Sequence, residues 1–291
     1  MSTKIGAVYP QTEFPSDPGA LTAFAQAIEG MGYRHFLAYD HVLGAGRATR
    51  PDWTGPYDAD SRFHEIFVLM AFVAAVTERV ELVTGVVILP QRQTALVAKQ
   101  AASVDVLSGG RMRLGIGVGW NPVEYEGLGK DFADRGARSE EQIRLMRALW
   151  AENPTTFHGT WESVVDAGIN PLPVARSIPV WIGGYVEATL KRAARMADGW
   201  FPWTEPDAEM EGMLERLREY TVAAGRAADA VTLEPQLNVG RGTAREWSAF
   251  IQRWTDLGAT QFCLSTLGNG FSTPDQHLAA LERAALELGV G

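Results

Sequence analysis

A closed barrel of eight parallel β-strands surrounded by helices, the (β/α)8 TIM barrel, is the α/β fold class that this sequence of 291 residues predicts. Strand-sized apolar runs alternate strictly with segments of helical periodicity, which indicates parallel strands joined by crossover helices. The alternation repeats eight times, and eight such units in about 250–300 residues fit one closed barrel. The strand runs are mostly apolar throughout, as in sheets buried on both faces. An open, doubly wound sheet is the alternative fold for the same pattern.

The predicted strands are short runs rich in Val, Ile, Leu and aromatic residues, bounded by turn residues. In chain order they cover residues 4–10, 34–43, 80–88, 111–119, 178–184, 198–202, 230–240 and 259–266. The C-terminal ends of parallel barrel strands meet at one face, where the chemistry of such barrels is found. Gly85 in the middle of the third run needs a reason, because glycine weakens the interior of a strand.

The predicted helices repeat apolar residues at helical spacing, and several of them end at glycine. In chain order they cover residues 17–33, 63–78, 94–110, 135–152, 185–197, 206–225, 243–258 and 273–289. Residues 43–62 and 153–173 read as loop insertions on the barrel rather than as domains. No break in composition marks a linker, so we expect residues 1–291 to form a single domain.

The composition is that of a soluble globular protein, with 46% hydrophobic residues, 21% charged residues and a net charge of −9. That charge argues against nucleic acid as a partner, since phosphate neutralisation needs clustered Lys and Arg. No apolar run approaches the ~20 residues of a membrane span, and the first residues do not resemble a signal peptide. We therefore expect a cytoplasmic protein. Cys263 is the single cysteine, which excludes internal disulfides and a cysteine-based metal site.

The residues predicted at the C-terminal ends of the strands are mainly aromatic or glycine, and few are charged. They are Tyr9, Pro10, Gln11, Tyr39, Asp40, His41, Thr84, Gly85, Val86, Gly117, Val118, Gly119, Trp120, Asn121, Gly183, Gly184, Tyr185, Trp200, Phe201, Pro202, Trp203, Ser265 and Thr266. Such a lining suits a flat ring system better than a metal ion or a highly charged sugar phosphate. His35, His64, His158 and His277 show no ligand spacing, and we expect no metal site.

Two glycine motifs follow predicted strands. The run "GIGVGW" is not a dinucleotide fingerprint, because the third glycine would fall at Trp120 or Pro122. Its small residues either let a neighbouring strand approach or form a backbone surface for a ring or ribityl chain. Residues 183–184, "GG", precede a helix whose free N–H groups can hold a phosphate, although Gly-Gly is also an ordinary turn. The run "NPVE" predicts a helix that starts with Asn121 as its N-cap.

His41, in the run "YDHV", lies at the end of the second predicted strand. An imidazole there is a candidate general acid or base, since it titrates near neutral pH. The alternative is a histidine that orients a loop or stacks on a ligand. Asp40 either binds a ligand hydroxyl or fixes its own loop. The sequence contains no metalloprotease, nucleophile-elbow or P-loop motif, which leaves His41 as the candidate catalytic residue.

Residues 77–150 carry a specific resemblance. They include "TGV", "VLSGGRMRLGIGVGW" and "RSEEQIRLMRALW", with "DHVL" upstream and "IGGYVEATLKRAARMADGW" downstream. With these runs the sequence resembles the bacterial luciferase-like superfamily, in its branch of coenzyme F420-dependent oxidoreductases. The resemblance covers most of residues 5–205, and the last third matches only in the alternation of strands and helices.

The resemblance implies a reason for Gly85. In this family the third strand ends in a bulge with a non-proline cis peptide that presses against the back of a flavin-like ring, and the matching bond is Gly85–Val86. The absent Cβ relieves crowding at that bend. A plain β-bulge is the local alternative. The cofactor contacts that the resemblance implies are Asp40, Thr84, Gly85, Val86, Gly117, Val118, Gly119, Gly183, Gly184 and Tyr185.

The resemblance also bears on the substrate. Sugar-phosphate dehydrogenases of this family carry a glutamate right after the glycine of the fourth strand, where this sequence has Trp120. A tryptophan narrows the pocket and favours an apolar or aromatic substrate. Trp200 and Trp203 are expected to extend that wall, with Trp53 as a further candidate, although each of these residues equally suits a core.

The expected function is hydride transfer between C5 of coenzyme F420 and a small organic molecule, with His41 moving the accompanying proton. The first alternative is an FMN-dependent monooxygenase of the same superfamily, which uses reduced flavin and O2 in a shielded pocket. The second alternative is a non-catalytic protein that binds flavin or deazaflavin. The helices at 63–78 and 94–110 are apolar beyond one stripe, and the resemblance implies a homodimer through this region.

Overall fold

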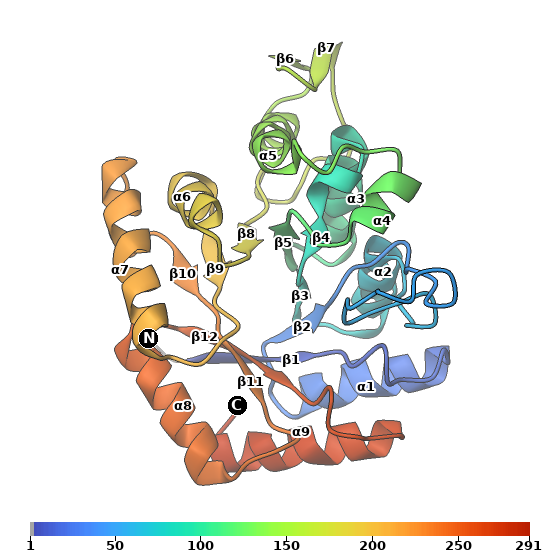
Figure 1. The fold of residues 1–291 in the computed structure, drawn as a ribbon, viewed down its shortest axis with the longest axis vertical. Coiled ribbons are helices and arrows are strands. Elements are labelled where there is room, and N and C mark those ends of the chain that lie inside the picture. The colour runs from blue at the N-terminus through green and yellow to red at the C-terminus, as the bar shows by residue number, and fades with distance from the viewer. Residues whose placement is uncertain (1–2) are drawn as a thin grey trace.

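Eight parallel strand positions form the wall of a barrel in the computed structural model, which describes residues 3–291 (Figure 1). The first six positions are β1 (Lys4–Val8), β2 (His35–Ala38), β3 (Glu81–Thr84), β5 (Met112–Gly117), β8 (Val180–Gly183) and β9 (Gly199–Phe201). Each of these strands pairs in parallel with the next along the chain. The last strand, β12 (Gln261–Ser265), pairs in parallel with β1, so the first and last strands of the chain are neighbours in the sheet.

The seventh strand of the barrel consists of two short strands that pair with different neighbours. Its first half, β10 (Thr232–Leu233), pairs with β9, and its second half, β11 (Gln236–Asn238), pairs with β12. Between them the N–H of Glu234 donates to Trp200 at 3.1 Å, and the carbonyl of Pro235 accepts from Cys263 at 3.0 Å. Proline has no N–H to donate to a ladder, so the strand breaks where it changes partner. The TIM-barrel prediction is confirmed, and the open doubly wound alternative is wrong.

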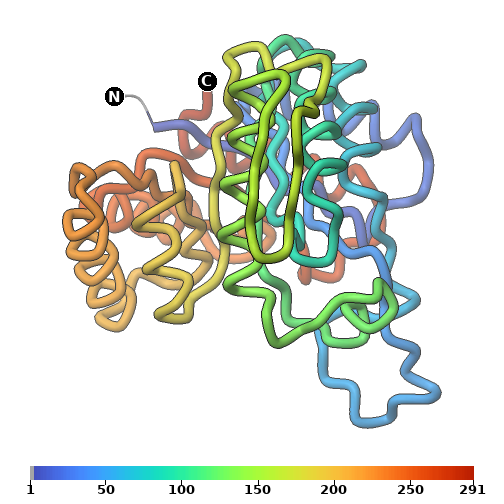
Figure 2. The backbone as a smooth tube through the Cα atoms, turned by 90° about the horizontal axis from the view of Figure 1, so that it is seen from above, coloured from blue at the N-terminus to red at the C-terminus, as the bar shows by residue number. Residues whose placement is uncertain are grey.

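Helices surround this sheet on its outer face (Figures 1 and 2). They are α1 (Pro18–Gly30), α2 (Ile66–Val76), α3 (Thr94–Leu107), α4 (Pro122–Gly127), α5 (Arg135–Ala151), α6 (Glu187–Met196), α7 (Ala208–Ala223), α8 (Ala244–Asp256) and α9 (Pro274–Leu288), with the 3-10 turn η1 (Leu89–Gln91). Local chemistry sets several starts: the Asp17 carboxylate accepts from the N–H groups of Gly19 and Ala20 at α1. Within residues 3–291, none of the helices combines the length and the apolar character needed to cross a bilayer.

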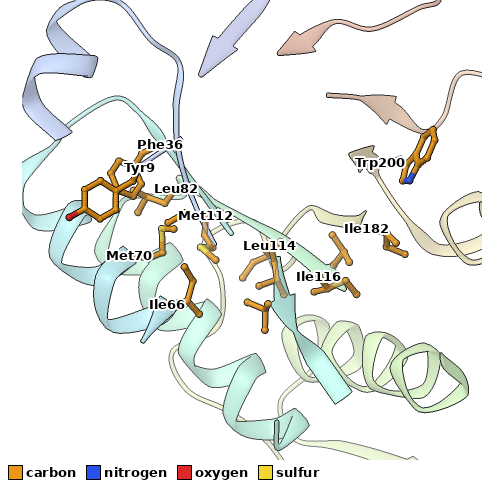
Figure 3. Close-up of a cluster of buried hydrophobic side chains, with 14 of the residues drawn as sticks. Tyr9, Phe36, Ile66, Met70, Leu82, Met112, Leu114, Ile116, Ile182 and Trp200 are labelled. Carbon is orange, nitrogen blue, oxygen red and sulfur yellow. The ribbon is translucent and has the colours of Figure 1, made fainter. Parts of the chain in front are cut away.

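The apolar side chains divide between two cores because strand side chains alternate in direction. The larger core lies between the strands and the helices, and Figure 3 shows part of it around Leu82, Leu114 and Trp200. The smaller core contains Val83 and Phe201 together with Val8, Leu37, Trp181 and Cys263. Leu82 and Val83, or Trp200 and Phe201, are adjacent in sequence but belong to different cores. This alternation decides which strand residues can reach the site.

Beside the smaller core lies a buried ionic cluster. His35 Nε2 is 3.0 Å from Glu234 Oε1, and Arg113 donates to the other carboxylate oxygen. The guanidinium of Arg113 also stacks 4.5 Å from the ring centroid of Trp181. Burial alone would raise the pKa of Glu234, but the charges and hydrogen bonds of Arg113 and His35 lower it to about 2. The carboxylate is therefore ionised and paired at neutral pH.

Three ligand-type side chains meet in this cluster although no sequence spacing joins them. Atoms of His35, Glu234 and Cys263 lie within 4.8 Å of one another. The Arg113 guanidinium already supplies positive charge to the carboxylate, and burial raises the pKa of the Cys263 thiol. A cation at this point would face Arg113 and a protonated thiol, so the cluster suits an ion pair better than a metal.

The third strand is interrupted at the bond that the resemblance singles out. β3 ends at Thr84, a cis peptide joins Gly85 to Val86, and β4 (Val87–Ile88) then pairs with β5. The expectation of a non-proline cis bond is confirmed, and the plain bulge is wrong. A Cβ on Gly85 would lie 2.6 Å from Leu37 Cδ2 and 2.9 Å from its Cγ. Glycine stands in this strand because the side chain of Leu37 fills the space.

One insertion differs from its prediction as a loop. Residues 153–173 contain an antiparallel hairpin of β6 (Thr155–His158) and β7 (Ser163–Ala167), which projects from the barrel (Figure 1). The Glu141 carboxylate on α5 accepts from the backbone N–H groups of its turn, at Thr160, Trp161 and Glu162. The pattern missed the hairpin because its strands are short and mostly exposed. Residues 43–62 contain neither helix nor strand, as predicted.

Candidate active site

A cavity of about 540 Å³ opens at the C-terminal ends of the barrel strands. Twelve of the residues expected at the site line it: Asp40, His41, Gly85, Val86, Gly117, Val118, Gly119, Trp120, Gly183, Gly184, Tyr185 and Trp203. Other lining residues are Tyr39, Tyr57, Ile88, Arg135, Val186, Thr189 and Phe201. The barrel therefore brings together side chains from segments that are widely separated in sequence.

Two of the expected residues do not reach the cavity. Thr84 is fully buried, and its Oγ1 donates to the carbonyl of Gly115 at 2.7 Å. Trp200 is also fully buried, and its Nε1 donates to the carbonyl of Gly184 at 2.9 Å. Strand alternation turns both side chains away from the barrel axis. Both side chains hold the backbone of the site in place, and contacts of Thr84 with the cofactor and of Trp200 with the substrate stay predictions.

The side chain of Val86 and three glycines form a flat part of the cavity wall. A Cβ on Gly117 would lie 2.5 Å from Val86 Cγ2, and a Cβ on Gly183 would lie 3.1 Å from Val86 Cγ1. Gly119 has φ of +68°, and a Cβ there would lie 2.7 Å from Ile88. Side chains at Gly117 and Gly119 would overlap Val86 and Ile88, so this part of the wall consists of glycine backbone with the side chain of Val86 packed against it. A surface of backbone and one small apolar side chain suits a planar ring system.

The opposite end of the cavity lies at the start of α6. The first N–H groups of a helix have no partner within it, and here they follow Gly184, whose φ is +118°. Glu187, in the first turn, turns away from the cavity: its carboxylate accepts from Tyr220 and Arg216. Thr189 lies beside Gly184, and Arg135 also lines the cavity. Free N–H groups, a guanidinium and a hydroxyl suit an anionic group such as a phosphate.

Tyr185 connects this end to the aromatic wall. Its hydroxyl accepts from the N–H of Trp203 at 2.9 Å, and burial raises the pKa of Tyr185 to about 12. The phenol is therefore neutral at physiological pH and offers a proton for donation. Trp203 packs at 5.6 Å from Tyr39 and 5.3 Å from Phe201 between ring centroids. The cavity thus has a neutral aromatic side.

His41 lies at the boundary between the cavity and the 43–62 loop. Its ring centroid is 4.8 Å from Phe63, 5.2 Å from Tyr57 and 5.6 Å from Trp120. Its Nδ1 is 3.3 Å from Glu124 Oε2. Burial alone would raise the pKa of Glu124, but hydrogen bonds from His41 and from the N–H groups of Val42 and Leu43 lower it below its usual range. A carboxylate therefore supports one nitrogen of the candidate acid or base.

The carboxylate of Asp40 accepts hydrogen bonds from other residues of the protein. Arg92 donates to Oδ1 at 2.8 Å and to Oδ2 at 3.0 Å, and the N–H of Ile88 donates to Oδ2 at 3.3 Å. Burial raises the pKa of Asp40, and the charge of Arg92 opposes that rise. These contacts tie the end of β2 to the chain just after the cis bond, which favours the loop-fixing interpretation of Asp40.

Sequence reasoning missed Glu124, Arg135 and Tyr57. Asn121 caps α4 as predicted, accepting from the N–H groups of Val123 and Glu124. The Glu124 carboxylate instead reaches across to His41, which is 83 residues away in sequence. No spacing rule detects such a pair. The signal in the sequence is an acidic residue three positions after an N-cap, and the helix-start motif alone already accounts for it.

Comparison with known proteins identifies the family. Residues 2–285 match the family described as luciferase-like monooxygenase. This chain belongs to the luciferase-like monooxygenase family. Family members and structural neighbours are oxidoreductases or monooxygenases, and this luciferase-like protein is accordingly an enzyme of the oxidoreductase class.

Two relatives and one solved structure with the same fold are similar to this chain. The uncharacterized protein Rv0940c of Mycobacterium tuberculosis is 35% identical to the luciferase-like chain over 209 residues, which are 70% of this chain and 72% of that protein. The FMNH(2)-dependent dimethylsulfone monooxygenase of Pseudomonas putida is 28% identical over 179 residues, 60% of this chain and 49% of that protein. The crystal structure of an F420-dependent secondary alcohol dehydrogenase with an F420-acetone adduct has a TM-score of 0.80 at 16% identity, covering 99% of both chains.

Proposed function

We propose that this luciferase-like protein is a coenzyme F420-dependent oxidoreductase acting on a small, apolar or aromatic organic substrate. The observation that carries the proposal is that the flat wall at Gly85–Val86 and the supported imidazole of His41 line one cavity. Hydride transfer to or from a carbon bonded to oxygen or nitrogen needs a proton partner, and His41 is placed to be that partner. The F420-dependent alcohol dehydrogenase that shares this fold supports the choice.

The cavity contains groups that fit each part of such a cofactor. Val86 and the backbone of Gly117 and Gly183 would support the ring, while Arg135 and the start of α6 would hold the phosphate. When bound, the deazaflavin would supply or accept a hydride at C5. The protein would orient the ring, exclude water with its aromatic side chains, and give or take a proton at Nε2 of His41.

The substrate would lie on the open side of the ring, between His41 and the aromatic residues. Trp120 stacks 5.6 Å from Trp53 of the 43–62 loop, and Tyr57 and Trp203 complete the surroundings. Most of this surface is apolar, and Trp120 occupies the position where sugar-phosphate dehydrogenases have a glutamate. An activated alkene, an imine or a ketone with an apolar body suits this arrangement better than a charged sugar.

An FMN-dependent monooxygenase is the second candidate. The dimethylsulfone monooxygenase is 28% identical over 60% of this chain, which supports this candidate. The same flat wall and anion-binding end accommodate FMN, and the aromatic side chains would shield reduced flavin from water. A protein that binds either cofactor without turnover is the remaining alternative.

Titration of the purified protein with oxidised F420 and with FMN separates these candidates. We expect at least tenfold tighter binding of F420, followed by acceptor-dependent oxidation of reduced F420 under anaerobic conditions. Tighter binding of FMN together with oxygen consumption would instead establish the monooxygenase. Binding without turnover across a panel of ketones, imines and alkenes would support the non-catalytic alternative.

We also propose a homodimer and a single domain over residues 1–291. Leu107 at the end of α3 is 73% exposed and Val68 on α2 is 68% exposed, so these neighbouring helices leave apolar side chains uncovered. A second copy would bury them. Strands from the two ends of the chain, β1 and β12, pair directly, which supports one domain.

A further inference from the structure

The segment that carries His41 is held by a single carboxylate. Glu124 on α4 is 1% exposed, and its Oε1 accepts from the N–H groups of Val42 and Leu43. Its Oε2 lies 3.3 Å from Nδ1 of His41. Both oxygens are therefore committed to the three consecutive residues that bring the imidazole to the cavity.

The other charged side chains near Glu124 and His41 already have ion-pair partners. Asp40, between the end of β2 and His41, is paired with Arg92, which also pairs with Glu65. Asp58, in the 43–62 loop, is paired with Arg47. Among the side chains of residues 3–291, His41 is the one basic group within ion-pair distance of Glu124.

The remaining ionisable neighbour of His41 is the phenol of Tyr57. Tyr57 packs against the imidazole at 5.2 Å between ring centroids, and burial raises its pKa, so it is neutral. The rings of Phe63 and Trp120 cover the other sides and carry no charge. The proton on Nδ1 thus faces the Glu124 carboxylate, which has no other cationic partner among residues 3–291. Nε2 is the nitrogen left to face the cavity.

We propose that Glu124 is a positioning residue that keeps Nδ1 of His41 protonated, directs Nε2 into the cavity and pairs with the imidazolium when both nitrogens carry protons. The inference deepens the proposed function, since it assigns the proton-transferring atom. A neutral His41 would accept a proton at Nε2, and the cationic form would return it to the substrate. In both steps Nδ1 keeps its proton and Glu124 keeps its charge.

The test is Glu124→Gln, which preserves shape and keeps an oxygen for the N–H groups of Val42 and Leu43. With ¹⁵N-labelled histidine, the wild type should show neutral His41 protonated at Nδ1, and Glu124→Gln should show a mixture of the two tautomers. His41→Asn assigns the signal. Glu126→Gln, an exposed position on the same helix, is the matched control and should behave as wild type. An unchanged tautomer in a folded Glu124→Gln protein would overturn the proposal.

Kinetics provide an independent readout. Glu124→Gln should lower kcat by about tenfold to hundredfold with little change in KM. A purely structural role would change KM and thermal stability instead. The double variant with His41→Asn should be no slower than His41→Asn alone; additive losses would contradict the coupling. Because the tautomer is measured without cofactor, it tests Glu124 even if F420 and FMN both fail to bind.

Discussion

Glu234 bridges His35 and Arg113 beside the inner core of the barrel: His35 Nε2 lies 3.0 Å from its Oε1, and the guanidinium donates to its other oxygen. Both His35 and Glu234 are completely buried. The carboxylate therefore has no water to stabilise its charge and depends on these two partners.

This pairing predicts a pH-dependent stability. The pKa of Glu234 is lowered from 4.5 to about 2 in the folded protein, so its contribution is complete above pH 4.5 and is lost as the pH falls through about 2. We expect the free energy of unfolding to fall by on the order of 2–3 kcal/mol over that range from this group. Denaturant unfolding at pH 5 and pH 2 measures the change. Glu234→Gln should be less stable at pH 5, and its free energy of unfolding should fall less between the two pH values than that of the wild type. An equal fall would contradict the assignment.

Gly85→Ala should destabilise the protein and weaken cofactor binding. The added Cβ would lie 2.6 Å from Leu37 Cδ2, and overpacking of this kind costs about 1–3 kcal/mol. Thermal unfolding and cofactor titration measure both effects. Leu37→Ala in the same chain should restore part of the binding by making room. Gly30→Ala, where the added atom meets nothing within 4 Å, is the control and should leave binding unchanged.

Arg135→Ala should selectively weaken ligands that carry a phosphate. A charged hydrogen bond contributes about 1.5–3 kcal/mol, so we expect roughly tenfold to hundredfold weaker binding of F420 or FMN. Riboflavin, which lacks the phosphate, should bind equally to wild type and variant. Arg144→Ala, an exposed arginine on the same helix, controls for net charge. Equal losses for FMN and riboflavin would show that Arg135 acts on the fold and not on the anion.

Trp120→Ala should weaken substrate binding and leave cofactor binding nearly unchanged. Trp120 is 41% exposed and packs against Trp53 and His41 at 5.6 Å between ring centroids. Its removal should raise KM for apolar or aromatic substrates several-fold and leave the Kd of the cofactor within twofold. Trp161→Ala, at the exposed turn of the hairpin, is the matched control. If Kd rises as much as KM, Trp120 belongs to the cofactor wall.

The sequence predicted the barrel well because every strand has a buried apolar run and every crossover has helical spacing. The sequence did not predict the β6–β7 hairpin, because its strands are too short and too exposed to show an apolar strand pattern. The direction of the Thr84 and Trp200 side chains could not be predicted from their place at strand ends, because strand side chains alternate: Val83 and Phe201 point to the inner core, and their neighbours do not. The link from Glu124 to His41 required coordinates, since nothing local relates residues 83 positions apart.

The divided seventh strand bears on where reactants can reach the site. β9 and β12 are joined through two short ladders that meet at Glu234 and Pro235. Glu234 pairs there with His35 of β2 and Arg113 of β5, so one ion cluster ties this break to two other strands of the barrel. The 43–62 loop lacks regular structure and packs Tyr57 against His41 and Trp53 against Trp120, so we expect reactants to enter and leave past this loop.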